Sequence, residues 1–257
     1  MPGALVLLRH GESTWNQENL FTGWHDVELT ELGKTEAIAA GVAMADAGVR
    51  LDIAHTSVLT RAVVTCNLAL EALGQVWLPV VRNWRLNERH YGTLQGLDKK
   101  ATVAEYGAEQ THLWRRSFDV PPPEVDRDSP EHPSNDRRYR LLPPDVLPAA
   151  ECLADVVRRV LPYWHDTVAP QLLAGLDVAI VAHGNSLRAL LMHLERVSAS
   201  DIADINVPTG VPRRYELADD LTVRSAEYLA DPDVVAAKQA AVVAQSASTD
   251  PAAHSRT

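Results

Sequence analysis

The sequence is poor in cysteine and contains no long apolar run. Its two cysteines, Cys66 and Cys152, are too few for a disulfide framework, and no CxxC pair offers the spacing of a zinc or redox site. We expect both to be small buried residues. No run approaches the roughly 18 apolar residues that cross a bilayer, and Met1 is not followed by a basic, signal-like segment. These features predict a soluble, cytoplasmic protein with no membrane partner.

Basic residues are also few: 24 Lys and Arg stand against 34 Asp and Glu, a net charge of −10. A protein that neutralises a phosphate backbone needs a basic face, so nucleic acid is excluded as a partner. For the same reason the six tryptophans are expected to pack rather than stack on bases. The shortage of basic residues is not uniform along the chain, because basic residues outnumber acidic ones from 82 to 116. This local excess predicts a cleft that binds a small anion.

The chain does contain short apolar runs that alternate with amphipathic segments. Strands are predicted at 4–8, 51–54, 77–81 and 177–182, and helices at 30–48 and 58–73. This pattern is typical of an α/β fold, here a single domain with a mostly parallel sheet and helices on both faces. A later pair of runs, 213–217 and 222–228, predicts a hairpin or an addition to the sheet edge.

Half of the 16 prolines lie between residues 119 and 148, which excludes a helix or a central strand there. Together with short helices expected at 99–106 and 109–117, this segment forms a long insertion over about residues 93–148. Such insertions are usually lids or binding loops. We therefore expect one catalytic domain, residues 1–240. The end of the chain, from 236, is expected to form a short helix and then a flexible tail over 241–257.

Two segments share the order strand, histidine, glycine, helix. Arg9-His10-Gly11 follows the first strand, and His183-Gly184 follows the fourth. Ligands of open α/β sheets bind beyond the carboxyl ends of the strands, so the two histidines can converge on one ligand. The arrangement suits phosphoryl transfer, in which a neutral imidazole attacks phosphorus, glycine keeps the approach open and cations neutralise the oxygens.

Other residue types needed for this chemistry are present nearby. Arg9 and Arg61 offer guanidinium groups that bind phosphate bidentately, and Ser13 and Asn16 lie near a helix start that favours anions. Glu88 is the candidate general acid or base. The alternatives are that each histidine is a structural residue at a strand end, and that Glu88 is a solvated loop residue paired with Arg89.

Six longer motifs within residues 4–240 resemble one family. They are Leu8–Ser13, Phe21–Trp24, Thr56–Leu59, Leu86–Gly92, Trp114–Arg116 and His183–Arg188. On these motifs the sequence resembles the 2,3-bisphosphoglycerate-dependent phosphoglycerate mutases of the histidine phosphatase superfamily. Arg-His-Gly alone is typical of the whole superfamily, whereas Glu-Arg-His-Tyr-Gly and Trp-Arg-Arg are specific to the mutases.

The resemblance implies a role for each matching residue. His10 would be the phosphorylated nucleophile, Glu88 the proton donor and acceptor, and His183 the group that polarises the transferring phosphoryl, with Arg9 and Arg61 completing the catalytic set. The substrate-binding set would be Arg9, His10, Gly11, Glu12, Ser13, Thr14, Trp15, Asn16, Thr22, Gly23, Arg61, Glu88, Arg89, His90, Tyr91, Lys99, Arg115, Arg116, Gly184 and Asn185.

The resemblance also implies an activity. Members of this family interconvert 3-phosphoglycerate and 2-phosphoglycerate in glycolysis and gluconeogenesis, with 2,3-bisphosphoglycerate as primer and intermediate, without a metal, and as dimers or tetramers. A bisphosphoglycerate synthase or a phosphatase on the same site is the alternative; Ser13, where sister synthases tend to have glycine, favours the mutase. A non-catalytic phospholigand-binding protein is a third possibility, but it would be expected to have lost His10 or Glu88.

The sequence departs from the family pattern in three places. Arg213 and Arg214 follow Pro212 where an aliphatic pair is usual, Ala150-Glu151-Cys152 replaces Thr-Glu-Ser, and the residues after Lys238 are divergent. None of these positions is a predicted catalytic residue. We therefore expect them to affect subunit contacts or lid support rather than chemistry.

Overall fold

The computed structural model describes residues 1–244 and contains one six-stranded sheet. Its strand order is β3-β2-β4-β1-β5-β6, and the strands are β1 (Leu5–Arg9), β2 (Ile53–Thr56), β3 (Val80–Arg82), β4 (Val178–Ala182), β5 (Arg213–Leu217) and β6 (Val223–Tyr228). The first four strands pair in parallel, whereas β5 runs antiparallel to β1 and β6 antiparallel to β5. The predicted α/β class, the mostly parallel sheet and the late hairpin are confirmed.

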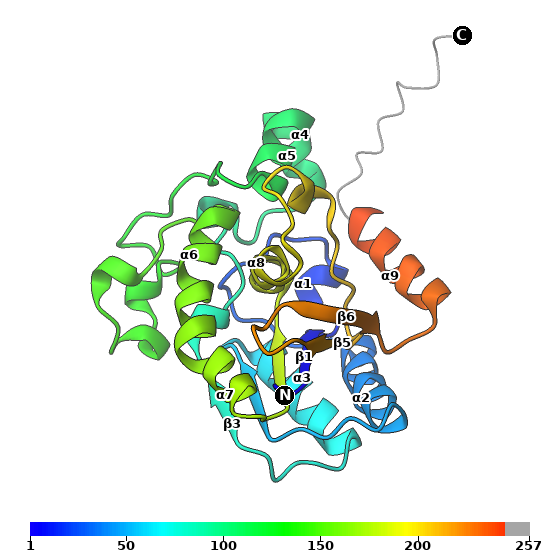
Figure 1. Ribbon diagram of the computed structural model, residues 1–257. Coiled ribbons are helices and arrows are strands. Elements are labelled where there is room, and N and C mark those ends of the chain that lie inside the picture. Colours follow the sequence, from blue (N-terminus) through cyan, green and yellow to red (C-terminus); the bar gives the residue numbers. More distant parts are fainter. Residues whose placement is uncertain (245–257) are drawn as a thin grey trace.

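Helices cover both faces of the sheet because successive side chains of a strand point to opposite faces. Leu5 and Leu7 of β1 pack against α6 (Leu153–Tyr163), α7 (Ala169–Leu173) and α8 (Gly184–Glu195). Val6 and Leu8 pack instead against α2 (Glu31–Asp46) and α3 (Thr60–Ala72). A single π-helical turn, Trp164–Val168, joins α6 to α7. The sheet thus lies between two helical layers (Figure 1). Among residues 1–244, no helix is long and apolar enough to span a membrane.

The close packing of α2 on α3 depends on Gly41. A Cβ added there would lie 2.3 Å from the carbonyl oxygen of Ala69 and 2.6 Å from the Cβ of Ala72. Alanine in a helix gains about 1 kcal/mol over glycine. Forcing a methyl group into a packed interface costs about 1–3 kcal/mol, so the clash should outweigh the gain.

We therefore expect Gly41→Ala to lower the free energy of unfolding by up to about 2 kcal/mol. The measurement is the urea midpoint. Ala39→Gly, at an exposed position of the same helix, reports the helix preference alone and is expected to cost about 1 kcal/mol. A Gly41→Ala protein more stable than wild type would contradict the packing described here.

The insertion consists of short helices and 3-10 turns. The 3-10 turn Trp84–Leu86 precedes it, and a second, Gly92–Leu94, lies at its start. Its two helices are α4 (Lys99–Tyr106) and α5 (Ala108–Arg116), as predicted to within one residue. Figure 1 shows α4 and α5 together at one end of the molecule. The proline-rich part contains only 3-10 turns, at Pro133–Asn135, Arg137–Tyr139 and Pro144–Val146. This described part contains no α-helix and no strand, which confirms the prediction that its prolines exclude both.

Three local expectations need correction. The third strand is β3 at Val80–Arg82 rather than 77–81, because Pro79 has no N–H to contribute to a ladder. Trp77 is 70% exposed and therefore does not pack in the core. The last helix, α9 (Pro232–Ala244), begins four residues earlier than expected and includes residues 241–244, which were assigned to the tail. The rest of that predicted tail, 245–257, lies outside the described residues.

Residues at which the sequence departs from the family pattern form ion pairs or hydrogen bonds with nearby residues. Arg213 forms an ion pair of 2.9 Å with Glu195 at the end of α8, and Arg214 pairs with Glu227 across the β5–β6 hairpin. Cys152 takes the position before α6, where its N–H donates to the Asp155 carboxylate at 2.9 Å. Both cysteines are buried and free, as expected. These substitutions therefore stabilise local structure away from the two histidines.

Candidate active site

The two predicted histidines meet beyond the carboxyl ends of β1 and β4. His10 borders a cavity of about 90 Å³ whose walls come from widely separated segments. The predicted site residues that line it are Arg9, His10, Asn16, Thr22, Gly23, Arg61, Glu88, Tyr91, Lys99, Arg115, Arg116, Gly184 and Asn185. The structure thus brings together residues from the first strand, the α3 start, the insertion and the α8 start.

His10 is held as a neutral imidazole with one ring nitrogen directed away from the backbone. Its ring is almost fully buried, and Nδ1 lies 2.7 Å from the carbonyl oxygen of Gly11. A carbonyl can only accept, so Nδ1 carries the proton and Nε2 keeps its lone pair. Burial, followed by the nearby charges of Arg61 and Arg9, places the pKa of His10 well below its usual value. His10 is therefore an available nucleophile at neutral pH.

His183 lies behind His10 rather than in the wall of the cavity. The two ring centroids are 4.9 Å apart, with the planes tilted by 60°. Nε2 of His183 is 2.7 Å from the Ser57 hydroxyl, and Nδ1 has no partner among the described residues. Burial, followed by the charge of Arg61, lowers the pKa of His183 well below its usual value. The structure therefore places a second neutral imidazole against the first.

Glu88 belongs to the segment that follows β3, and its side chain contacts the amino end of α8. The residue is 8% exposed. Its Oε1 accepts hydrogen bonds from the backbone N–H of Asn185, at 3.1 Å, and of Arg89, at 2.8 Å. The amino end of a helix favours negative charge, so this carboxylate occupies a position that suits an anion. The Arg89 guanidinium does not pair with it but donates to the carbonyl of Arg115 at 2.6 Å. The alternative of a solvated Glu88 paired with Arg89 is therefore wrong.

Cations dominate the cavity. Its lining includes Arg9, Arg61, Lys99, Arg115, Arg116 and Arg188, and Glu88 is the only carboxylate among the described residues that form the wall. Burial lowers the pKa of Arg61 to about 10 and, together with Arg115, that of Lys99 to about 7. The buried Nε atoms of Arg9 and Arg188 have no protein partner among residues 1–244.

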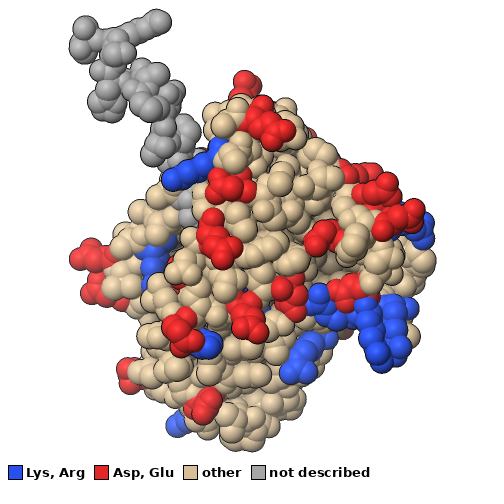
Figure 2. Space-filling view, turned by 180° about the vertical axis from the view of Figure 1, so that it is seen from behind, with Lys and Arg blue, Asp and Glu red and all other residues tan. Residues whose placement is uncertain are grey.

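Buried cations without counter-charges are unfavourable unless an anion completes the site. The face shown in Figure 2 differs from the cavity, since acidic side chains are scattered across it beside a few groups of basic ones. The unpaired guanidinium nitrogens therefore suit a small ligand with more than one anionic group, such as a bisphosphate. Within residues 1–244, no three His, Cys, Asp or Glu side chains are grouped so that they could hold a metal ion.

Some predicted binding residues lie outside the cavity wall. Ser13 is buried and caps α1 (Thr14–Gln17), with its hydroxyl 2.9 Å from Oδ1 of Asn16, and Trp15 stacks on the His25 ring at 4.2 Å. The predicted site residues that do not line the cavity are Gly11, Glu12, Ser13, Thr14, Trp15, Arg89, His90 and His183. Contacts between these residues and a substrate stay predictions.

The cavity is also lined by residues that were not among the predicted site residues, although Phe21 and Arg188 belong to quoted motifs. They are Leu20, Phe21, Arg188, Ile205, Asn206, Val207 and Val242. Arg188 donates to Oδ1 of Asn185 at 3.0 Å, and its place one helical turn after Gly184 is a signal that could have found it. Asn206 follows the 3-10 turn Asp201–Asp204 and accepts from Arg116 at 2.7 Å. Nothing in its local sequence indicates this contact, because it depends on a long-range fold.

His90 gives the site a measurable pH dependence. Burial lowers the pKa of His90 to about 4 from its usual value of about 6.5. Between these values the unfolded chain binds a proton that the folded chain does not, so stability falls as the pH falls. We expect this histidine to contribute a loss of up to about 1.4 kcal/mol per pH unit in the free energy of unfolding below pH 6.5.

Urea unfolding between pH 4.5 and 8 checks this expectation. His90→Gln should show a shallower loss of stability with falling pH than wild type, whereas His112→Gln, which changes an exposed histidine, should keep the wild-type slope. Equal slopes for all three proteins would show that His90 does not stay neutral in the folded state.

Comparisons with known proteins show the family of this chain. Residues 5–223 match the family model of the histidine phosphatase superfamily (branch 1). A 2,3-bisphosphoglycerate-dependent phosphoglycerate mutase of Pasteurella multocida (strain Pm70) is 58% identical over 225 residues, which cover 88% of this chain and 99% of that protein.

Solved structures show the same fold at lower identity. A mycobacterial glucosyl-3-phosphoglycerate phosphatase superposes with a TM-score of 0.67 at 24% identity, covering 88% of this chain and 97% of that one. A structure described as mycobacterial hydrolase 1 superposes with a TM-score of 0.66 at 26% identity, covering 87% and 96%. The chain therefore belongs to branch 1 of the histidine phosphatase superfamily and, within it, to the family of the 2,3-bisphosphoglycerate-dependent phosphoglycerate mutases.

Proposed function

We propose that this protein interconverts 3-phosphoglycerate and 2-phosphoglycerate through a phosphohistidine at His10, with 2,3-bisphosphoglycerate as primer and intermediate. The observation that carries the proposal is the neutral imidazole of His10, a residue that lines a cavity walled by buried cations. The identity of 58% to a phosphoglycerate mutase, over nearly all of that protein, supports this substrate class.

The exchange begins with phosphorylated His10 and a bound monophosphoglycerate. Glu88 takes the proton from the free substrate hydroxyl, and that oxygen attacks the phosphorus. The N–P bond breaks, and its electron pair returns to Nε2 of His10. Arg9, Arg61 and the first backbone N–H groups of α8 neutralise the transferring oxygens. The products are a bisphosphoglycerate and a protonated Glu88.

The second half regenerates the phosphoenzyme. After the bisphosphoglycerate has turned in the site, His10 attacks the phosphorus at the other carbon and the bond from that phosphorus to the glycerate oxygen breaks. Glu88 returns its proton to this oxygen, so protons and phosphoryl groups balance over the cycle. The same half-reaction, started from added 2,3-bisphosphoglycerate, primes the unphosphorylated enzyme. His183, packed against His10, polarises the transferring group.

The remaining cations bind the rest of the substrate. Lys99, Arg115 and Arg116 belong to the insertion and face the cavity, where they suit the carboxylate and the second phosphate. A phosphohistidine is lost to hydrolysis if water reaches it, so the intermediate must turn in an enclosed site. Insertion residues 93–148 act as the lid, and Val242 of α9 adds to the enclosure.

The proposal extends to the organisation of the protein. Residues 1–240 form one catalytic domain, which works in the cytoplasm, in glycolysis and gluconeogenesis, as a homo-oligomer. The outer edge of β3 supports the oligomer, because in the described structure β3 pairs only with β2 and the nearby side chains of Val76, Trp77 and Val81 are exposed.

One assay tests the proposed function. Purified protein with a trace of 2,3-bisphosphoglycerate should interconvert the two monophosphoglycerates faster than it hydrolyses either or accumulates bisphosphoglycerate. Removing the primer should slow the exchange, and adding a chelator should not. Hydrolysis faster than exchange would instead identify a phosphatase, and net accumulation of bisphosphoglycerate a synthase.

A further inference from the structure

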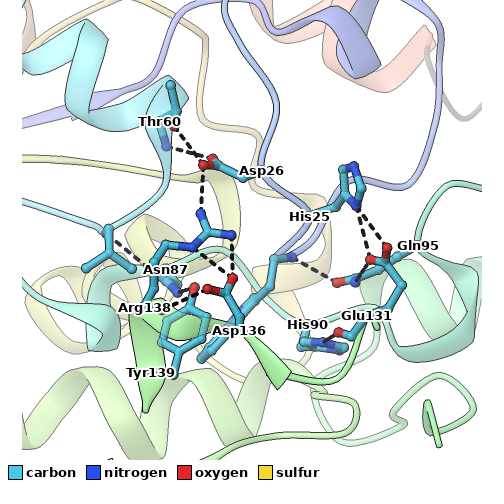
Figure 3. Close-up of polar contacts among 12 residues, drawn as sticks. His25, Asp26, Thr60, Asn87, His90, Gln95, Glu131, Asp136, Arg138 and Tyr139 are labelled. Atoms are coloured by element: carbon cyan, nitrogen blue, oxygen red, sulfur yellow. Dashed lines mark hydrogen bonds and ion pairs between the residues drawn. The ribbon is translucent and has the colours of Figure 1, made fainter. Parts of the chain in front are cut away.

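A short part of the insertion, residues 131–139, lies against the loop formed by residues 22–26; we call it the strap. Arg138 forms an ion pair of 2.7 Å with Asp26, and a carboxylate oxygen of Glu131 lies in hydrogen-bond contact with Nδ1 of His25 at 3.1 Å (Figure 3). No strap residue lines the active cavity. The strap therefore acts on the site through the segments that it contacts and not by lining the cavity.

The loop at 22–26 in turn holds the buried Arg61 guanidinium. Nη1 of Arg61 donates to the carbonyl of His25 at 3.0 Å, and Nη2 donates to the carbonyl of Gly23 at 2.7 Å. Asp26 fixes the start of α3 as well, because its carboxylate accepts from both the N–H and the hydroxyl of Thr60, each at 2.7 Å. The carboxylate bound by Arg138 thus anchors the helix turn that carries Arg61.

The same strap reaches the segment that carries Glu88. The Tyr139 hydroxyl accepts from the side-chain amide of Asn87 at 2.8 Å, and Oδ1 of Asn87 accepts from the N–H of Val58. The Tyr139 ring also packs on Trp24 at 4.8 Å, and Trp24 Nε1 donates to the carbonyl of Glu88 at 2.5 Å. The strap is thus connected both to the segment that carries Arg61 and to the segment that carries Glu88.

We propose that Arg138 and Asp26 are positioning residues, and that their ion pair holds Arg61 in the geometry that binds the transferring phosphoryl group. This role differs from the enclosure assigned to the lid, since the strap acts through the loop at 22–26 and not by covering the cavity. The proposal rests on the proposed function only for the identity of the phosphoryl donor. It requires no more than that Arg61 binds a phosphate oxygen.

Positioning has a large effect, because displacing a binding group by about 1 Å can cost up to 100-fold in rate. The side chains of Asp26 and Arg138 are only 26% and 33% exposed, so their geometry is well defined. In a low-dielectric pocket shared with other cations, an Arg61 released from its carbonyl partners would move away from the phosphate position.

The test measures phosphate binding by the unphosphorylated enzyme with inorganic phosphate and orthovanadate as probes, by calorimetry. Arg138→Met and Asp26→Asn should each weaken binding by roughly 10-fold and lower the exchange rate by a similar factor. The double variant should bind no more weakly than the weaker single variant, because both changes break one link. Arg138→Lys should restore part of the loss.

Arg137→Met is the matched control. Arg137 is the exposed neighbour of Arg138, and its replacement removes the same charge without removing the ion pair to Asp26. It should bind phosphate within twofold of wild type. Circular dichroism and melting temperatures establish that each variant is folded.

Three results would overturn the proposal: phosphate affinity of Arg138→Met within twofold of wild type, an equal loss in Arg137→Met, or losses that multiply in the double variant. Because phosphate binding is measured without turnover, a wild-type protein that proved not to be a mutase would leave this test intact. Failure of the strap proposal and failure of the proposed function are thus distinguishable.

Discussion

Replacing His10 with alanine is expected to lower the exchange of 3-phosphoglycerate and 2-phosphoglycerate by about 10⁴-fold or more. The reason is that the Nε2 lone pair, left free by the hydrogen bond from Nδ1 to the Gly11 carbonyl, is the proposed acceptor of the phosphoryl group. The measurement is the initial rate of exchange in both directions with saturating primer.

Binding should respond very differently from turnover in this variant. Inorganic phosphate should still bind, because Arg9, Arg61 and the start of α8 are unchanged. His112→Ala, at an exposed position of α5, is the control and should keep wild-type exchange. A His10→Ala protein with more than about a tenth of wild-type activity would mean that no covalent step at His10 is needed.

Replacing Glu88 with glutamine should lower the turnover number by about 10²–10⁴-fold, the range for loss of a general acid or base. Glutamine has nearly the same shape, and its Oε1 can still accept from the N–H groups of Asn185 and Arg89. The geometry of the site is therefore retained while the ability to exchange a proton is lost.

This variant should also bind phosphate more tightly than wild type, because a negative charge beside the anion has been removed. The combination of slower turnover and tighter phosphate binding separates proton transfer from a merely structural role, which would weaken both. Glu105→Gln, exposed on α4, should change neither quantity. Weaker phosphate binding in Glu88→Gln would contradict the assignment of Glu88 as proton donor and acceptor.

Much of the fold could be predicted because local patterns determine it. The apolar runs at β1 and β4 are buried on both faces, and the prolines of the insertion prevent regular structure. The details that failed had local causes that the apolar pattern does not show. Pro79 shifts β3, and α9 begins at Pro232 because the Asp231 carboxylate accepts from the N–H of Asp233 at 2.8 Å and so caps the helix.

The convergence of His10, His183 and Glu88 could be predicted, because these residues follow strands or occur in motifs. The rest depends on segments that meet only in three dimensions. Asn206 accepts a hydrogen bond from Arg116, which is 90 positions away in the chain. Asp26 accepts a hydrogen bond from Thr60 and forms an ion pair with Arg138 of the insertion. Neither position has a local pattern that distinguishes it from an ordinary loop residue.

The central claim is that a phosphoryl group resides on His10 during the exchange. Its most direct measurement uses 2,3-bisphosphoglycerate labelled in its phosphates, rapid quenching in alkali, which preserves phosphohistidine, and peptide mass spectrometry. The account predicts label on His10 alone, and loss of that label to newly formed bisphosphoglycerate when unlabelled 3-phosphoglycerate is added. Label on another residue, or continued exchange with no label on the protein, would contradict it.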